Sequence, residues 1–166
     1  MRILGIDPGL AIVGWAVIDS NRGRLTPVAY GAITTPAHTD IEARLLMIKS
    51  DLEEIIKRYT PDEMAIEELF FNQNITTAIT VAEARGVIIM TAAQNNVPVF
   101  EYTPLQVKQA VVGYGKAEKK QVMLMVSSLL KLAATPKLDD TCDALAIAVC
   151  HAHTGKSRLK QFYNIK

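Results

Sequence analysis

The order of strand and helix patterns is the feature that most restricts the fold of this chain. Alternating apolar residues predict strands at 2–7, 12–19, 25–34, 62–68 and 97–102. Helical spacing predicts a helix between the third and fourth strands, a second at 75–95, and mostly helix after residue 102. Short early connections favour antiparallel pairing, whereas the later alternation favours parallel pairing. We therefore expect an α/β fold in the order βββαβαβαα, with a five-stranded mixed sheet flanked by helices.

Two helix starts carry local signals. Thr39 and Glu42 form a capping-box pattern that predicts the start of the first helix, which should end near Tyr59. Thr103 followed by Pro104 predicts an N-cap with proline at the first helical position. The helix so opened should carry Lys108 at the protein surface.

Length and composition indicate one domain. The chain has 166 residues, of which 49% are hydrophobic, enough for a sizeable core. We expect a single domain over residues 1–153 and a short basic tail over 154–166 that is poorly ordered. No run approaches the roughly 20 apolar residues that span a bilayer, and the start lacks a signal-peptide pattern. A cytoplasmic location is therefore expected, with Cys142 and Cys150 reduced.

Charge is divided unevenly along the chain. Residues 1–102 carry 8 basic and 13 acidic side chains, a net charge of −5, whereas residues 103–166 carry 10 and 4, a net charge of +6. A basic surface beside acidic residues suits a polyanion that is held by its phosphates. A solvated basic face without a special role is the alternative.

Four carboxylates are expected to meet at one edge of the sheet. Asp7 ends the first strand and Glu67 lies near the end of the fourth, so parallel neighbouring strands would bring the two together. Asp140 and Asp143 are three residues apart at the head of an apolar segment, and on a helix they share one face. An N-cap role would be the simpler explanation for Asp140 taken alone.

Such a cluster predicts a metal site. Carboxylates a few ångströms apart repel one another, and cations between them stabilise the ionised form. Hard oxygen ligands favour Mg²⁺, with Mn²⁺ as a substitute. Two ions about 3.5–4 Å apart can activate water and stabilise both the attacking and the leaving oxygen of a phosphodiester displacement. The predicted chemistry is metal-assisted phosphodiester hydrolysis; the alternative is four ordinary capping or surface acids.

The helix predicted at 75–95 is rich in small residues. It contains Ala78, Ala82, Ala84, Gly86, Ala92 and Ala93. Glycine in a helix interior costs about 1 kcal/mol, which suggests that something approaches closely at Gly86. The helix either packs tightly on its own sheet or forms a subunit interface.

Several motifs together resemble a known family. They are residues 5–9 (GIDPG), 65–68 (AIEE), 98–102 (PVFEY), 106–109 (QVKQ), 112–115 (VGYG), 117–122 (AEKKQV) and 140–148 (DTCDALAIA). In this order and spacing they resemble the RuvC family of bacterial Holliday junction resolvases, from residue 1 to about 153. The resemblance implies an RNase H-like fold and a homodimer that makes paired Mg²⁺-dependent cuts in opposed strands of four-way DNA junctions, in DNA recombination and repair. It also implies the branch-migration proteins RuvA and RuvB as partners.

The resemblance also implies roles for individual residues. The family's four catalytic, metal-binding carboxylates correspond to Asp7, Glu67, Asp140 and Asp143, each site holding two ions. The aromatic residue that stacks on junction bases corresponds to Phe70, and the two functional lysines correspond to Lys108 and Lys119. Glu68 is an additional acid beside the expected one, and a shift of one residue would exchange the two.

Three other functions share part of this pattern. A YqgF-like nuclease that acts on structured RNA shares the first acidic strand, but the motifs at 106–109 and 117–122 favour the resolvase. An actin-like ATP-binding protein needs two such lobes, and 166 residues supply one. A DNA-binding scaffold without catalysis would be expected to lack one of the acids.

Overall fold

The expected mixed sheet with flanking helices is present. The computed structural model describes residues 1–69, 75–134, 136 and 139–163. Its strands are β1 (Arg2–Asp7), β2 (Ile12–Asn21), β3 (Arg24–Thr34), β4 (Glu63–Glu67) and β5 (Val99–Tyr102). Its helices are α1 (Ile41–Tyr59), α2 (Ile75–Gln94), α3 (Pro104–Val112), α4 (Lys119–Leu129) and α5 (Asp139–Tyr163). The strand order is β3-β2-β1-β4-β5, antiparallel from β3 to β1 and parallel from β1 to β5.

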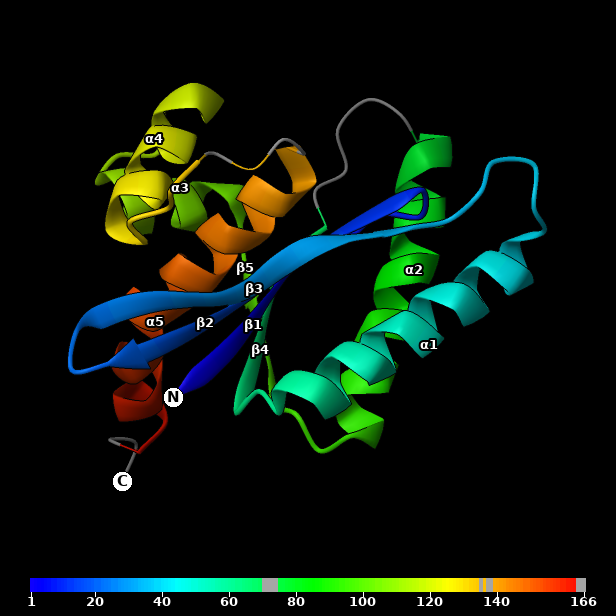
Figure 1. Ribbon diagram of the computed structural model, residues 1–166, viewed down its shortest axis with the longest axis horizontal. Helices are drawn as coiled ribbons and strands as arrows, with labels where there is room; N and C mark the ends of the chain where they lie inside the picture. The colour runs from blue at the N-terminus through cyan, green and yellow to red at the C-terminus, as the bar shows by residue number, and fades with distance from the viewer. Residues whose placement is uncertain (70–74, 135, 137–138, 164–166) are drawn as a thin grey trace.

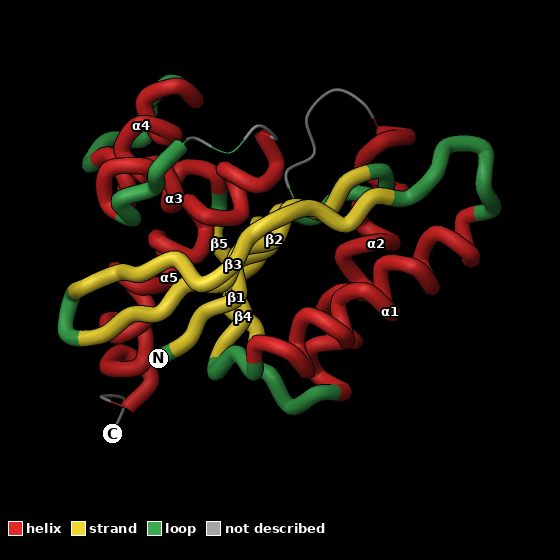
Figure 2. The backbone as a smooth tube through the Cα atoms, in the orientation of Figure 1, coloured by secondary structure: helices red, strands yellow, loops and turns green. Residues whose placement is uncertain are grey.

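The sheet separates two apolar cores. Figures 1 and 2 show α1 and α2 on one face of the sheet and α3, α4 and α5 on the other. Ile3 and Ala65 pack into the core on the α5 face, whereas Leu4, Ile6 and Ile66 pack against α1 and α2. Because side chains alternate along a strand, the odd-numbered residues of β1 and β4 face α5.

Helix α5 lies unusually close to the sheet. A Cβ atom placed on Gly5 would lie 2.2 Å from the carbonyl oxygen of Ala144, and one on Gly14 would lie 2.0 Å from that of Asp140. The Thr141 hydroxyl donates a hydrogen bond of 3.1 Å to the Gly31 carbonyl of β3. Glycine at both strand positions therefore allows the first turns of α5 to rest on β1 and β2.

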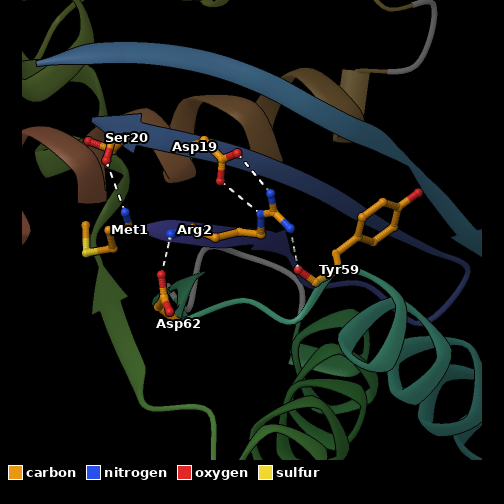
Figure 3. A network of polar contacts seen from close by, with 6 residues as sticks. All are labelled: Met1, Arg2, Asp19, Ser20, Tyr59 and Asp62. Atoms are coloured by element: carbon orange, nitrogen blue, oxygen red, sulfur yellow. Dashed lines mark hydrogen bonds and ion pairs between the residues drawn. The ribbon is translucent and has the colours of Figure 1, made fainter. Parts of the chain in front are cut away.

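Polar contacts of Arg2 hold the opposite end of β1 (Figure 3). Its guanidinium donates two hydrogen bonds of 2.9 Å to the Asp19 carboxylate of β2 and one of 3.0 Å to the carbonyl of Tyr59 at the end of α1. Its backbone N–H donates to Asp62, and the terminal amine of Met1 donates to the Ser20 carbonyl. These contacts hold the N-terminal end of β1 against β2 and the end of α1.

The capping box predicted at Thr39 was wrong. Helix α1 begins at Ile41, and Asp40 occupies the N-cap without a side-chain capping hydrogen bond. The N-cap predicted at Thr103 is confirmed: its side chain accepts from the Gln106 backbone N–H at 3.2 Å, and the Gln106 side chain accepts from the Thr103 backbone N–H at 3.0 Å, which completes a capping box. The expected end of α1 near Tyr59 agrees with the structure, so the error there concerns only the signal for the start of the helix.

The predicted order also lacked one helix. In the part of the chain that the structure describes, three helices follow β5, where the patterns indicated two. Gly113 ends α3 in the left-handed conformation, with φ of 93°, and α4 starts after a separate capping box formed by Glu118 and Gln121. At the other end, α5 continues through Tyr163, past the residue 153 at which the sequence suggested the end of the domain.

Among the helices in the described part of the chain, none has both the length and the apolar character needed to cross a membrane.

Candidate active site

Two of the predicted carboxylates lie at neighbouring strand ends. Asp7 is the last residue of β1 and Glu67 the last residue of β4. The two strands are parallel with Ile6 opposite Ile66, so the next residue of each strand comes side by side at the same edge. Both positions are odd-numbered and therefore face α5.

Helix α5 brings the other two carboxylates to this edge. The Asp140 backbone rests on Gly14, and Gly14 is the residue of β2 that pairs with Asp7. Asp143 lies three residues further along α5, on the same face as Asp140. Asp140 is inside the first helical turn because α5 begins at Asp139, so the simpler N-cap explanation does not hold.

The cluster carries more negative charge than its surroundings balance. Burial, followed by repulsion from Glu67, Asp143 and Asp140, raises the pKa of Asp7 to about 8. Burial and then the charge of Asp143 raise the pKa of Glu67 as well. The charges of all three other predicted acids therefore act on Asp7, which places them within electrostatic range of its carboxyl.

Both predicted lysines lie beside these acids. Lys108 and Lys119 line a cavity of about 180 Å³ together with Glu67 and Asp143, and its other wall is apolar. Figure 1 shows α3 and α4, which carry the two lysines, grouped beside the first turns of α5. The Lys119 ammonium lies 2.8 Å from a carboxylate oxygen of Asp143. Positive charge from either lysine lowers the pKa of Glu67 against the effect of burial.

Phe70 lies outside the described residues, so its predicted stacking role stays a prediction. Glu68, the competing acid, follows β4 with an exposed side chain, and its backbone N–H donates to the Tyr102 carbonyl at 2.9 Å. Strand alternation turns it away from the face that Asp7 and Glu67 share. The geometry therefore favours Glu67 as the member of the cluster.

Sequence reasoning missed the residues that position the cluster. The Arg85 guanidinium of α2 donates to the Glu67 carbonyl at 3.1 Å and forms an ion pair with Glu101, which ties the end of β4 to α2 and β5. The available signal was that Arg85 is the one basic residue of this helical segment. The packing roles of Gly5 and Gly14 had no comparable signal, because they depend on where α5 lies.

The donor chemistry of the cluster fits a divalent metal. Burial and the charges of neighbouring acids raise the pKa of Asp7 and Glu67, so a cation would be stabilised in this site, and oxygen donors suit Mg²⁺ or Mn²⁺. As the side chains stand in residues 1–69, 75–134, 136 and 139–163, no three His, Cys, Asp or Glu residues are grouped closely enough to hold a metal ion. The carboxylates would therefore have to converge on an entering ion.

Comparison with known proteins adds independent information. Residues 3–151 match the family model described as crossover junction endodeoxyribonuclease RuvC. A protein of that name from Clostridioides difficile is 56% identical over 94% of this chain and 92% of its own length. The relative of that name from Desulfitobacterium hafniense strain DCB-2 is 58% identical over 93% of each chain.

A solved structure agrees with the sequence relatives. The structure of Thermus thermophilus RuvC in complex with Holliday junction substrate matches with a TM-score of 0.90 and 33% identity, over 95% of this chain and 96% of that one. This likeness confirms the expected RNase H-like fold.

Proposed function

This chain belongs to the RuvC family of crossover junction endodeoxyribonucleases, and from that membership we propose that it resolves four-way DNA junctions by cutting two opposed strands. The observation that carries the proposal is the cluster around Asp7, to which three separate elements contribute carboxylates. A YqgF-like activity on structured RNA is not favoured, because relatives that match over nearly the whole chain are named as RuvC.

Asp7, Glu67, Asp140 and Asp143 would hold two Mg²⁺ ions, for which Mn²⁺ can substitute. When bound, the metal supplies an activated water and stabilises charge on the reacting phosphate oxygens. The protein orients the ligands through the strand ends and the seating of α5 on Gly14. Burial raises the pKa of Asp7 and Glu67 and so disfavours their ionised forms. A cation beside them would stabilise these ionised forms.

The basic residues around the cavity would hold the DNA. Lys108 and Lys119 lie on the side of the cluster formed by α3 and α4, where a phosphate could lie between their ammonium groups and the acids. Phosphate contacts position the backbone and carry no base information. Phe70 would supply the contact to bases by stacking on a base at the crossover.

A second copy of the chain would complete the enzyme. The junction has opposed strands related by approximate two-fold symmetry, so two incisions call for two clusters in a symmetric dimer. On α2, Ile79, Glu83, Gly86 and Met90 are all exposed at helical spacing, and a Cβ on Gly86 would meet no atom of the described chain within 4 Å. This helix is our proposed interface, with RuvA and RuvB as further partners in the bacterial cytoplasm.

Cleavage of defined substrates tests the function. Labelled four-way junction, linear duplex and structured RNA are incubated with and without Mg²⁺, using the wild type and Glu67→Gln. We expect symmetric cuts in the junction alone, only with metal, and a loss of cleavage by orders of magnitude in Glu67→Gln while junction binding survives. Glu68→Gln is the matched control. Loss of cleavage in Glu68→Gln with retention in Glu67→Gln would show that the assignment at the end of β4 is wrong, and preferred cutting of RNA would refute the proposal.

A further inference from the structure

Lys119 occupies an unusual place between two helices. It is the first residue of α4, and its ammonium reaches α5, lying 2.8 Å from Asp143 and 3.6 Å from Asp139. Its side chain is 50% exposed. The contact therefore joins α4 to α5 at the cavity that Lys119 lines together with Glu67 and Asp143.

Asp143 is shared between this lysine and the acid cluster. Its charge raises the pKa of both Asp7 and Glu67, and Lys119 lowers the pKa of the same two groups. In the metal-free protein the Lys119 ammonium thus supplies part of the positive charge that the cluster needs. An ammonium 2.8 Å from an Asp143 oxygen repels an incoming cation, so Lys119 and a metal ion compete for this carboxylate.

The structure allows Lys119 to leave Asp143 without a movement of the helix. A capping box fixes the start of α4, because the Gln121 amide oxygen accepts from the Glu118 backbone N–H at 2.9 Å and from the Tyr114 hydroxyl at 3.0 Å. The flexible four-carbon stem of lysine can rotate from this fixed backbone position. Since Lys119 lines the cavity beside Glu67, its rotated ammonium can remain there.

We propose that Lys119 is the resident counter-ion of the carboxylate cluster, and that a metal ion binding to Asp143 releases its ammonium to contact a phosphate of the substrate. Metal binding and DNA binding are then coupled through one side chain, and each strengthens the other by the same factor. That this phosphate belongs to junction DNA rests on the proposed function. The competition between Lys119 and a metal ion for Asp143 does not depend on the proposed function.

Metal titration without DNA tests the competition. Mn²⁺ binding is measured by calorimetry and by electron paramagnetic resonance for the wild type, Lys119→Gln, Lys119→Arg and Lys120→Gln. Lys120 is the adjacent exposed lysine, so its variant controls for the loss of one nearby charge. We expect Lys119→Gln to bind Mn²⁺ about tenfold more tightly, and Lys120→Gln and Lys119→Arg to stay within about twofold of the wild type.

Unfolding with and without metal gives a second readout. In Lys119→Gln the metal-free cluster lacks the positive charge of the ammonium, whereas in the metal-bound cluster the metal ion itself supplies positive charge. The rise in melting temperature on adding saturating Mg²⁺ should therefore be larger in Lys119→Gln than in the wild type. Equal or weaker Mn²⁺ affinity of Lys119→Gln, together with an unchanged rise in melting temperature, would overturn the proposal.

Junction binding tests the transfer to phosphate. The affinity for four-way junction is measured in EDTA and in Ca²⁺, which accepts carboxylate ligands in a flexible geometry. We expect Ca²⁺ to increase junction affinity by a larger factor in the wild type than in Lys119→Gln. The same factor in both proteins would refute the coupling. A wild type that shows the DNA-free competition but cuts no junction would instead refute the proposed function.

Discussion

Replacement of Asp7 by asparagine should stabilise the metal-free protein while abolishing cleavage. The pKa of Asp7 is raised to about 8 because the carboxyl is buried beside three other acids. Between about pH 4 and pH 8 the unfolded chain has lost this proton and the native protein retains it. The native state therefore binds more protons than the unfolded state, and the free energy of unfolding falls as pH rises through this window.

The size of the effect follows from the pKa shift. The pKa rises from 3.8 to about 8. At about 1.4 kcal/mol per pKa unit, and allowing for solvent screening at this open site, ionisation of Asp7 lowers the free energy of unfolding by roughly 3–5 kcal/mol across the window. Asparagine has the same shape and no charge, so the free energy of unfolding of Asp7→Asn does not fall in this way as the pH rises. For a chain of this length the gain corresponds to about 10 °C in melting temperature.

Urea unfolding in EDTA at pH 4.5 and pH 8 measures this difference. We expect wild type and Asp7→Asn to differ little at pH 4.5 and by several kcal/mol at pH 8, and Mg²⁺ to reduce the difference at pH 8. Asp51→Asn, the same change at an exposed position of α1, is the control. A stability difference between Asp7→Asn and wild type that is independent of pH would refute the buried, mutually repelling cluster.

Three further predictions concern α5, the DNA contact and the interface. Gly14→Ala places a methyl 2.0 Å from the Asp140 carbonyl oxygen and should lower stability by about 3 kcal/mol in urea unfolding, whereas Gly86→Ala, which meets nothing within 4 Å, should raise it by up to about 1 kcal/mol. Lys108→Ala should weaken junction binding and reduce the slope of log affinity against log salt by about one unit; an unchanged slope would exclude a phosphate contact. Gly86→Leu should shift the dimer toward monomer in analytical ultracentrifugation and cause singly nicked junctions to accumulate, and a fully dimeric folded variant would place the interface elsewhere.

Local chemistry in the sequence was sufficient to predict the strands and to place the candidate acids at the ends of these elements. Alternation along β1 and β4 predicted strands ending near Asp7 and Glu67, and the same alternation set Glu67 apart from Glu68. Helical spacing placed Asp140 and Asp143 on one face of α5. These features depend on side-chain periods of two and about 3.6 residues, which a chain carries whatever its tertiary structure. The break between α3 and α4 was not predicted, because the sequence shows a glycine at position 113 but not that Gly113 adopts the left-handed conformation that ends α3.

Contacts between distant residues were decided only by the tertiary structure. The sequence does not reveal that α5 rests on Gly14. It also does not reveal that α4 places the Lys119 ammonium 2.8 Å from Asp143. The pKa of Asp7 likewise depends on burial and on carboxylates that lie far away in the sequence. Electrostatic and steric interactions depend on distance in space, and the packing of α4 and α5 against the sheet sets those distances. The sequence by itself therefore determined which acids could form the cluster. The fold determined how burial and neighbouring charges shift the pKa of Asp7 and Glu67, and which lysine contacts Asp143.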